Sequence, residues 1–230
     1  INPMLTPEER KDAIKGVPEG LNLLNELIDE RRKNPGDDFL STLILAEDHG
    51  SKLSNMEMCA LVGAVLGAGS DTAVDLHSYL IKTLLQHPDQ LQALKDDESL
   101  VQGAISETLR YESSGKTGLA RYASEDININ GFDVKKGQMV QLITSTAKKK
   151  KKMYNNPEEF DIKRDHDKSI SFGQGPHYCI GVTLVRSQTE VMLRELFKRF
   201  PNISLGNEIV YDYNHHNARR MDVMTVNTNL

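Results

Sequence analysis

The spacing of hydrophobic and polar positions predicts helices over the first fifty or so residues of the chain. Thr6-Pro7-Glu8-Glu9 supplies the cap residue, the proline and the acids that begin a helix. A second helix is expected to begin near Pro18-Glu19 with one apolar face, and Asn34-Pro35-Gly36 stops it. The apolar residues from Phe39 to Ile44 suggest a third, short helix that ends near His49-Gly50. Nothing in this part of the chain demands chemistry.

A long helical pattern follows and has an unusual middle. Ser54-Asn55-Met56-Glu57 has the pattern of a capping box, and Pro88 marks the far end. At about 1.5 Å per residue, the expected helix of about 32 residues would span roughly 48 Å, which is long enough to cross a domain. From Gly67 to Thr72 it holds two glycines, which cost about 1 kcal/mol each relative to alanine, and polar side chains that compete with the backbone. This segment is either a place where a ligand approaches or a close helix crossing, and the pattern leaves both interpretations open.

The second half of the chain mixes shorter helices with strands. Helices are expected near Asp89 to Lys95 and from about Glu98 to Tyr111. Between residues 119 and 146 alternating apolar positions and an Asn-Gly turn signal predict a small antiparallel sheet. Residues 201–230 read as loop and strand, and alternation from Met221 to Thr225 suggests a C-terminal hairpin. The predicted fold class is therefore mainly α with small antiparallel β-sheets.

The residues that most clearly suggest chemistry run from Phe172 to Gly181 and read F-G-Q-G-P-H-Y-C-I-G. A helical pattern from Val182 to Phe200 starts directly behind them, so Cys179 sits in a glycine-bent loop before a helix N-terminus. The amide groups there favour an anion and prepare a thiolate, which could attack a carbon, exchange with a disulfide or bind a metal.

The neighbours of the cysteine narrow these choices. Gly173 and Gly175 let the backbone approach a flat partner closely or take a positive φ. His177 lies two residues before Cys179 and could serve another point of the same ligand. No second cysteine is near, which argues against a Cys-x-x-Cys redox pair and a zinc knuckle.

Composition excludes several classes of protein. The chain has 230 residues, 38% of them hydrophobic and 27% charged, which is typical of a soluble globular protein. A net charge of -5 gives no reason to expect nucleic acid. No apolar run is expected to reach the length of a membrane span, and no secretory signal opens the chain. Two cysteines are too few for a disulfide scaffold and suggest the cytoplasm, with Cys59 on an apolar helix face as a core residue.

The spacing Phe-Gly-x-Gly-x-His-x-Cys-x-Gly resembles the cysteine loop of cytochrome P450 enzymes, the haem-thiolate monooxygenases, and of their soluble bacterial type in particular. The resemblance implies haem b as the cofactor and Cys179 as the ligand of its iron. Phe172, Gly173 and Gly181 are the other loop positions that match, and His177 would bind a haem propionate.

The middle of the long helix, Ala68-Gly69-x-Asp71-Thr72, resembles the oxygen-activation segment of the same family. The resemblance implies that Ala68 and Gly69 leave room over the haem face. Asp71 and Thr72 would deliver protons to dioxygen, with Thr72 beside the dioxygen and Asp71 linking to water.

Two further matches concern arginines. Glu107-Thr108-Leu109-Arg110 places an acid and a base on one helix face, which alone is a common surface pair. Between the long helix and the cysteine loop it resembles the E-x-x-R motif of the family, whose role is structural, and Arg164 is the candidate third member. Arg121 alone would be a solvated surface residue, but the resemblance implies contact with a haem propionate.

Two features depart from the family pattern. Family members are considerably longer, and only about the C-terminal two thirds of the pattern is present, so residues 1–230 read as the C-terminal part of a single domain with an incomplete cytochrome P450-like fold. Lys148 to Lys152 replace a segment of the Asn-Arg-Asp type. They suggest a solvated basic run or a basic patch for an acidic redox partner.

His215-His216 reads as an exposed loop rather than a metal site.

The resemblance implies a monooxygenase that inserts one oxygen atom from dioxygen into an apolar small molecule. Electrons would come from NAD(P)H through a separate ferredoxin or flavodoxin. The main alternative is a haem-binding but catalytically incompetent fragment or degenerate family member. A different class, a cysteine nucleophile enzyme with His177 as base, lacks an orienting acid nearby. A peroxygenase using hydrogen peroxide is disfavoured by the Asp71-Thr72 pair.

Overall fold

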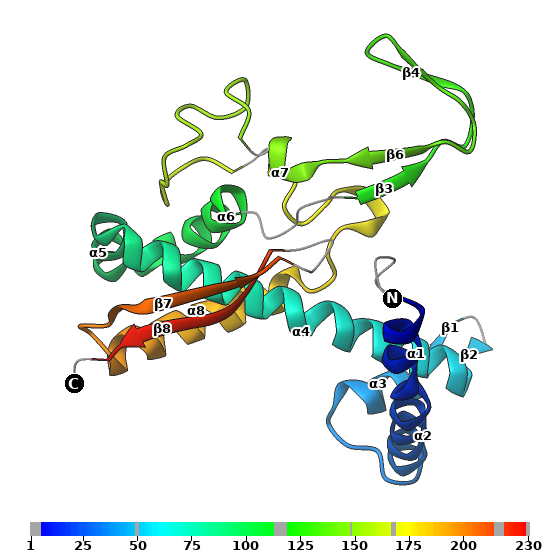
Figure 1. Ribbon diagram of the computed structural model, residues 1–230. Helices are drawn as coiled ribbons and strands as arrows, with labels where there is room; N and C mark the ends of the chain where they lie inside the picture. Colours follow the sequence, from blue (N-terminus) through cyan, green and yellow to red (C-terminus); the bar gives the residue numbers. More distant parts are fainter. Residues whose placement is uncertain are drawn as a thin grey trace. The chain divides into compact units, whose positions relative to one another are not determined.

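The computed structural model describes residues 6–48, 51–112, 119–147, 149–166, 169–213 and 219–228. The chain divides into two compact units, Ile1–Thr72 and Ala73–Leu230, each with its own hydrophobic cluster (Figure 1). The long helix α4 (Asn55–Gln86) belongs to both, because the division falls within it.

The first unit is built from helices and one very short hairpin. Its elements before α4 are α1 (Pro7–Lys15), α2 (Val17–Lys33), α3 (Phe39–Leu45), β1 (Glu47–Asp48) and β2 (Ser51–Lys52). Thr6 caps α1 as expected, and it does so through a capping box with Glu9 that was not predicted from the sequence. The expected third helix ends at Leu45 and not near His49-Gly50, because Ala46 is extended and β1 and β2 pair behind it.

The core of the first unit confirms the expectation for Cys59. This cysteine, Ile28 and Met58 are buried together, and apolar residues of α2, α3 and the start of α4 pack around them. Cys59 is therefore a packing residue and takes no part in the chemistry considered below.

Helix α4 begins and ends where the sequence predicts. The Ser54 amide donates to the Glu57 carboxylate at 2.8 Å, the Glu57 amide donates to Ser54 Oγ at 3.3 Å, and the helix stops before Pro88. It is continuous through Gly67 to Thr72. The hydroxyls of this segment bond back to the helix, Ser70 Oγ to the Leu66 carbonyl at 2.5 Å and Thr72 Oγ1 to the Ala68 carbonyl at 2.6 Å.

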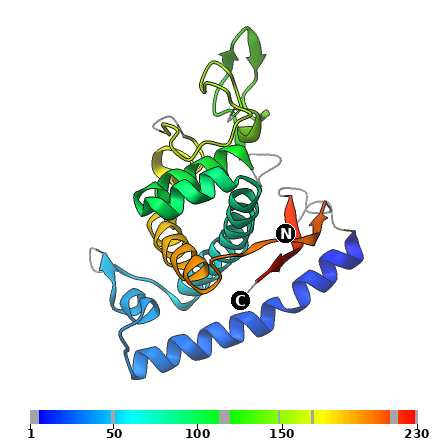
Figure 2. The ribbon, with the colours of Figure 1, turned by 90° about the vertical axis from the view of Figure 1, so that its left-hand side faces the viewer.

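The second unit packs helices around one core, which Figure 2 views from one side. Besides the end of α4 its helices are α5 (Pro88–Asp96), η1 (Glu98–Leu100), α6 (Val101–Tyr111), α7 (Thr144–Ala147), η2 (Gly175–His177) and α8 (Val182–Arg199). The core draws apolar residues from α4, α5, α6 and α8 and from the segment around Phe160 and Ile162. At Gly103 of α6 an added Cβ would lie 2.1 Å from the Ile162 carbonyl oxygen, so only glycine permits this approach.

The strands of this unit form three antiparallel pairs. β3 (Leu119–Tyr122) pairs with β6 (Met139–Leu142), β4 (Ile127–Ile129) with β5 (Phe132–Val134), and β7 (Ser204–Asp212) with β8 (Arg220–Asn227). Asn130 and Gly131 both take positive φ, 50° and 91°, as the Asn-Gly turn signal requires. Figures 1 and 2 show the β4–β5 hairpin extending away from the helices of the unit. The predicted class, mainly α with small antiparallel sheets, is confirmed.

One helix of the described residues, α4, is long and apolar enough to cross a membrane by length and composition. From the sequence we expected no apolar run as long as a membrane span, and α4 shows that this expectation is wrong as far as length and composition go. A single helix of this kind is weak evidence for a span, because the core helix of a soluble protein passes the same test.

Candidate functional site

The cysteine loop is held in shape by its glycines and by one closing hydrogen bond. Gly173 and Gly175 take φ of 76° and 73°, values that side chains other than glycine rarely adopt. The Cys179 amide donates to the Phe172 carbonyl at 2.9 Å and closes the loop. Gly181 then caps α8, so the thiol stands two residues before that cap.

The thiol is exposed in apolar surroundings. Cys179 is free and exposed, and the exposed fractions of its neighbours are 92% for Ile180, 50% for Tyr178 and 63% for Leu184. Exposed apolar side chains around a thiol suit a flat apolar group that would cover them. Among the described residues no cluster of three His, Cys, Asp or Glu could hold a metal ion. A metal at Cys179 would therefore take its remaining ligands from elsewhere, as the iron of a macrocycle does.

Arg121 and His177 have the chemistry that carboxylates require. Arg121 lies on β3, is exposed, and donates to the Ala120 carbonyl at 2.9 Å. His177 ends η2 and is exposed. Neither forms an ion pair with another described residue, so both can donate to propionate groups. No hydrogen bond of the described residues joins His177 to Cys179, which leaves the nucleophile alternative without support.

The α4 segment lies in the first unit and is open. Ala68, Gly69, Asp71 and Thr72 are all exposed. A Cβ added at Gly67 or Gly69 would meet no atom within 4 Å, so no helix crossing in the described structure requires these glycines. Ligand approach at this segment stays a prediction.

Glu107, Arg110 and Arg164 come together in the second unit. The side chains of Glu107 and Arg110 are 0% and 1% exposed, which rules out a surface pair. Arg110 binds both carboxylate oxygens of Glu107 at 2.7 Å, and Arg164 Nε donates to Glu107 Oε1 at 3.1 Å. Arg110 also donates to the carbonyls of Pro157 and Glu159, at 2.6 and 2.9 Å. The three side chains thus tie α6 to the segment that leads into the cysteine loop.

His166, which sequence reasoning did not select, lies next to this group. Its Nε2 is 3.5 Å from Glu107 Oε2, and its side chain is 11% exposed. Burial lowers the pKa of His166, more than the Glu107 charge raises it, so the imidazole is neutral at neutral pH. The sequence carried no motif that could have found it.

A second missed cluster joins α4 to the C-terminal hairpin. Glu112, just after α6, forms ion pairs with Lys82 of α4 and with Arg219, beside β8. Arg219 Nε donates to Tyr79 Oη at 2.9 Å, and the ring of Tyr79 stacks with that of Tyr211. Lys82 lies on the apolar face of α4, and a lysine in such a place is a sequence signal for a buried partner. Glu112 and Arg219 lie far from it in the sequence, and no local pattern points to them.

The lysine run is described only in part. Lys149 to Lys152 are exposed, whereas Lys148 lies outside the described residues. Lys149 Nζ is 3.6 Å from Glu158 Oε2 and 5.5 Å from the centre of the Tyr111 ring. His215 and His216 also lie outside the described residues.

Comparison with known proteins gives consistent relatives. A family model described as cytochrome P450 matches residues 6–205. The chain is 38% identical over 220 residues to epothilone C/D epoxidase of Sorangium cellulosum, covering 95% of this chain and 52% of that enzyme. It is 36% identical to 6-deoxyerythronolide B hydroxylase of Saccharopolyspora erythraea, covering 88% of this chain and 50% of the hydroxylase.

Solved structures agree. The epothilone D-bound P450epoK superposes with a TM-score of 0.89 at 37% identity, covering 95% of this chain and 54% of that one. P450BioI, in complex with an acyl carrier protein carrying hexadec-9Z-enoic acid, gives 0.90 at 31% identity, covering 99% and 58%. The chain spans about half the length of the curated relatives it matches, so the expectation of an incomplete fold of this kind is confirmed.

Proposed function

The chain belongs to the cytochrome P450 family, and from this premise we propose that it is the haem-binding part of a monooxygenase. The enzyme would insert one oxygen atom from dioxygen into an apolar small molecule. The observation that carries the proposal is the exposed thiol of Cys179, held by a glycine-bent loop directly before α8 and surrounded by exposed apolar side chains.

We propose haem b as the cofactor, because the residues present fit it. The Cys179 thiolate would hold the iron, and no cluster of three His, Cys, Asp or Glu among the described residues offers another metal site. The other contacts would come from the loop positions and from two donors for the propionates: Phe172, Gly173, Gly181, Arg121 and His177. When bound, the haem supplies the oxidation chemistry, and a thiolate ligand favours O–O cleavage.

We propose that Asp71 and Thr72 of α4 are the proton-handling residues. Thr72 Oγ1 donates to the Ala68 carbonyl, so its hydroxyl proton has a resting partner on the helix. Asp71 is exposed, so its carboxylate is open to the water to which it would link. As the resemblance implies, Ala68 and Gly69 would leave room for the haem, because they present little side chain. A proton route of this kind supports the use of dioxygen rather than peroxide.

Glu107, Arg110 and Arg164 would have a structural role in this proposal. Both guanidinium groups contact the Glu107 carboxylate, and that carboxylate also accepts the Asp161 amide at 2.9 Å. The segment so fixed precedes the cysteine loop in the chain, and the group would hold the loop behind the haem.

We further propose that residues 1–230 are the C-terminal part of a single domain. Large apolar side chains stand exposed along α4, among them Leu61, Val65 and Leu66. Because the chain spans about half of its relatives, the segment without a counterpart here would cover this face.

Electrons would come from NAD(P)H through a separate ferredoxin or flavodoxin in the cytoplasm. The exposed residues Lys149 to Lys152 support an acidic protein partner, since exposed basic groups steer oppositely charged partners. An apolar substrate is supported by relatives whose names include an epothilone epoxidase and a 6-deoxyerythronolide B hydroxylase.

A reconstitution experiment tests the proposed activity. The chain is loaded with haem and supplied with NADPH, a surrogate ferredoxin and its reductase, and epothilone D or hexadec-9Z-enoic acid as test substrates. We expect a product with one oxygen atom from isotopically labelled dioxygen. Thr72→Ala should lower the product formed per NADPH consumed, and Ser70→Ala, on the same helix segment, should not.

The alternative is a haem-binding chain that is catalytically incompetent. Haem binding and NADPH consumption without any product, from these substrates and from a wider apolar panel, would favour it. Equal product yields from the Thr72→Ala and unmodified chains would contradict the role of Thr72 but not the proposed monooxygenase activity.

A further inference from the structure

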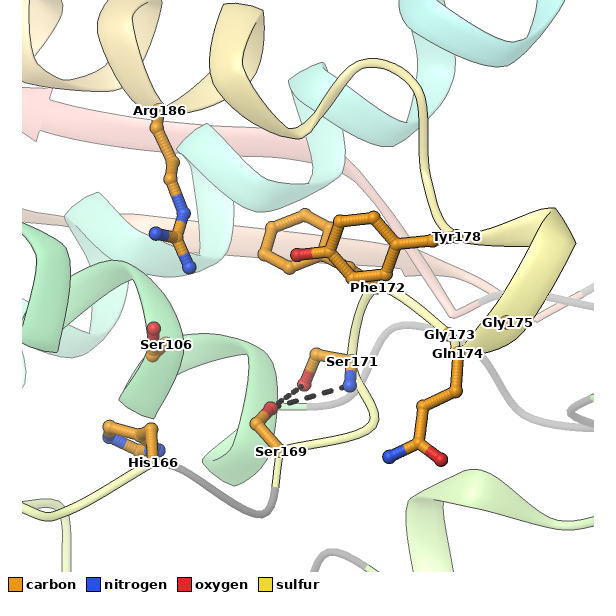
Figure 3. Close-up of a pocket in the computed structure, with 10 residues that line it drawn as sticks. All are labelled: Ser106, His166, Ser169, Ser171, Phe172, Gly173, Gln174, Gly175, Tyr178 and Arg186. Atoms are coloured by element: carbon orange, nitrogen blue, oxygen red, sulfur yellow. Dashed lines mark hydrogen bonds between the residues drawn. The ribbon is translucent and has the colours of Figure 1, made fainter.

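A cavity of about 520 Å³ lies in the second unit beside the cysteine loop. It is lined by residues of α6 and α8, by His166 and by residues between 169 and 178 (Figure 3). Its polar lining comes from Ser106, His166, Ser169, Ser171, Gln174 and Arg186, and we call it the Arg186 pocket. Among the described residues that line it there is no aspartate or glutamate, and the carboxylate of Glu107 lies behind His166, 3.5 Å from its Nε2.

Arg186 brings a permanent positive charge to this pocket. Its Nε is buried without a hydrogen-bond partner, and its guanidinium lies 5.6 Å from the centre of the Phe172 ring. Figure 3 shows this group pointing from α8 toward Ser106 and the Phe172 ring. The other two arginines of α8 are paired, Arg194 with Glu190 and Glu98, and Arg199 with Glu195. Among the described residues Arg186 has no carboxylate partner.

The opposite wall adds one more buried polar group that lacks a hydrogen-bond partner, the imidazole of His166, whose Nε2 lies 3.5 Å from Glu107 Oε2. Neither ring nitrogen of His166 has a hydrogen-bond partner among the described residues, although the side chain is almost fully buried. Ser169 Oγ donates to Ser171 Oγ at 3.2 Å, and the Ser171 amide donates to Ser169 Oγ at 3.3 Å. Buried polar groups without partners cost about 1–3 kcal/mol each, so a ligand that supplied acceptors would be stabilised here.

We propose that the Arg186 pocket binds a small oxyanion, the carboxylate or phosphate group of a small molecule. A guanidinium fork matches two oxygens of such a group, and the Ser106 hydroxyl and the His166 ring nitrogen can donate to the others. The residues that would hold the oxyanion are not those proposed to bind the haem iron or the propionates, although Phe172 and Gly173, proposed as haem contacts, also line the pocket.

Occupancy of the pocket would reach the cysteine loop through Phe172. The ring of Phe172 contacts the Arg186 guanidinium, and its carbonyl accepts the Cys179 amide at 2.9 Å. An oxyanion that fixes the guanidinium would therefore restrain the loop that carries the thiol. The binding itself does not depend on the proposed monooxygenase activity.

Calorimetric titration of the 230-residue chain with inorganic phosphate, and separately with acetate, tests the proposal. Ionic strength is held constant with sodium chloride, so that general screening is excluded. We expect saturable binding of at least one of the two oxyanions, with one site per chain. Arg186→Gln should weaken the binding by about tenfold or more, because the charge-assisted bonds are lost. Arg194→Gln, a paired arginine on the same helix, should leave it unchanged.

Absence of saturable binding of both oxyanions, or equal weakening by the two substitutions, would overturn the proposal. If circular dichroism shows that Arg186→Gln does not fold, Ser106→Ala decides instead. This variant should bind several-fold more weakly, and unchanged binding would overturn the proposal. Haem loading provides the last arm. If the oxyanion still binds to the haem-loaded chain, the pocket is a separate site. If haem abolishes oxyanion binding, the pocket belongs to the haem site and the proposal is wrong.

Discussion

The buried carboxylate of Glu107 shows how much of this structure depends on single side chains. It is enclosed by α6 and the segment 157–166, and two arginines and the Asp161 amide contact it. In such a group the charges are compensated only while all partners remain, because removing one leaves the others buried and unpaired.

Glu107→Gln should therefore destabilise the chain strongly. Removing one partner of a buried ion pair costs about 3–5 kcal/mol, and here two arginines lose their counter-charge. Urea unfolding at neutral pH measures the free energy of unfolding. Glu158→Gln is the matched control, because its pair with Lys149 is exposed and contributes less than about 1 kcal/mol. Similar losses from both substitutions would contradict this account of the group.

A second residue-scale prediction concerns pH and His77 of α4. Burial lowers the pKa of His77 below its ordinary value of 6.5, and its Nε2 is 3.0 Å from Thr189 Oγ1. The unfolded chain therefore takes up a proton at higher pH than the folded chain does. The stability associated with His77 is fully present above about pH 6.5 and is lost as the pH falls from there through the folded pKa.

We expect the free energy of unfolding to fall between pH 7.5 and pH 5.5, and to fall less in His77→Gln. Urea unfolding at a series of pH values measures the slope. His177→Gln serves as control, because His177 is exposed. The prediction fails if the unmodified chain and His77→Gln lose the same stability over this range.

At the scale of elements, the sequence predicts best where local chemistry decides the outcome. The helix cap at Thr6, the capping box at Ser54, the stop before Pro88 and the Asn130-Gly131 turn all appear in the structure, because each depends on residues a few positions apart. The end of α3 was missed, since the β1–β2 pairing that follows Leu45 leaves little trace in the hydrophobic pattern.

Contacts between distant elements were much harder to predict. The Lys82–Glu112–Arg219 cluster joins residues from three parts of the chain, and only Lys82, on an apolar helix face, carries a local signal. The group of Glu107, Arg110 and Arg164 was predicted only because its members resemble the E-x-x-R motif of the family and the arginine that joins it. The need for glycine at Gly103 could not be predicted either, because it depends on the close approach of the Ile162 carbonyl, which is distant in the sequence.

Gly103→Ala should disrupt the contact between α6 and the segment before the cysteine loop. The new Cβ would lie 2.1 Å from a backbone oxygen, so helix or segment must move, at a cost of about 1–3 kcal/mol or more. Gly63→Ala on α4 is the control, since nothing lies within 4 Å of its added Cβ and alanine favours a helix by about 1 kcal/mol. Thermal unfolding should separate a destabilised first variant from a neutral or stabilised second one. A neutral Gly103→Ala would show that the approach is looser than described.

For the whole molecule, the exposed apolar surface on α4 is the feature that the proposed C-terminal part of a longer domain would explain. Leu66 is 58% exposed, whereas Leu80, on the same helix, is fully buried. Exposed apolar faces of this kind bind dyes or partners. The purified chain should therefore bind the apolar dye ANS while it keeps its helical circular dichroism spectrum.

Leu66→Ser should lower ANS fluorescence and leave the free energy of unfolding nearly unchanged. Leu80→Ser should instead lower the stability by about 2–5 kcal/mol, because it removes core packing. Undiminished ANS fluorescence in Leu66→Ser would contradict the assignment of this face as the uncovered one.

The most direct test of the central claim is the spectrum of the reduced, carbon monoxide-bound protein after loading with haem. The account predicts the red-shifted Soret band of a thiolate-ligated haem. Cys179→Ser should abolish this band, and Cys59→Ala, which alters the buried cysteine, should retain it. A thiolate band that survives Cys179→Ser, or a haem-loaded chain that shows no such band, would contradict the assignment of Cys179 as the iron ligand.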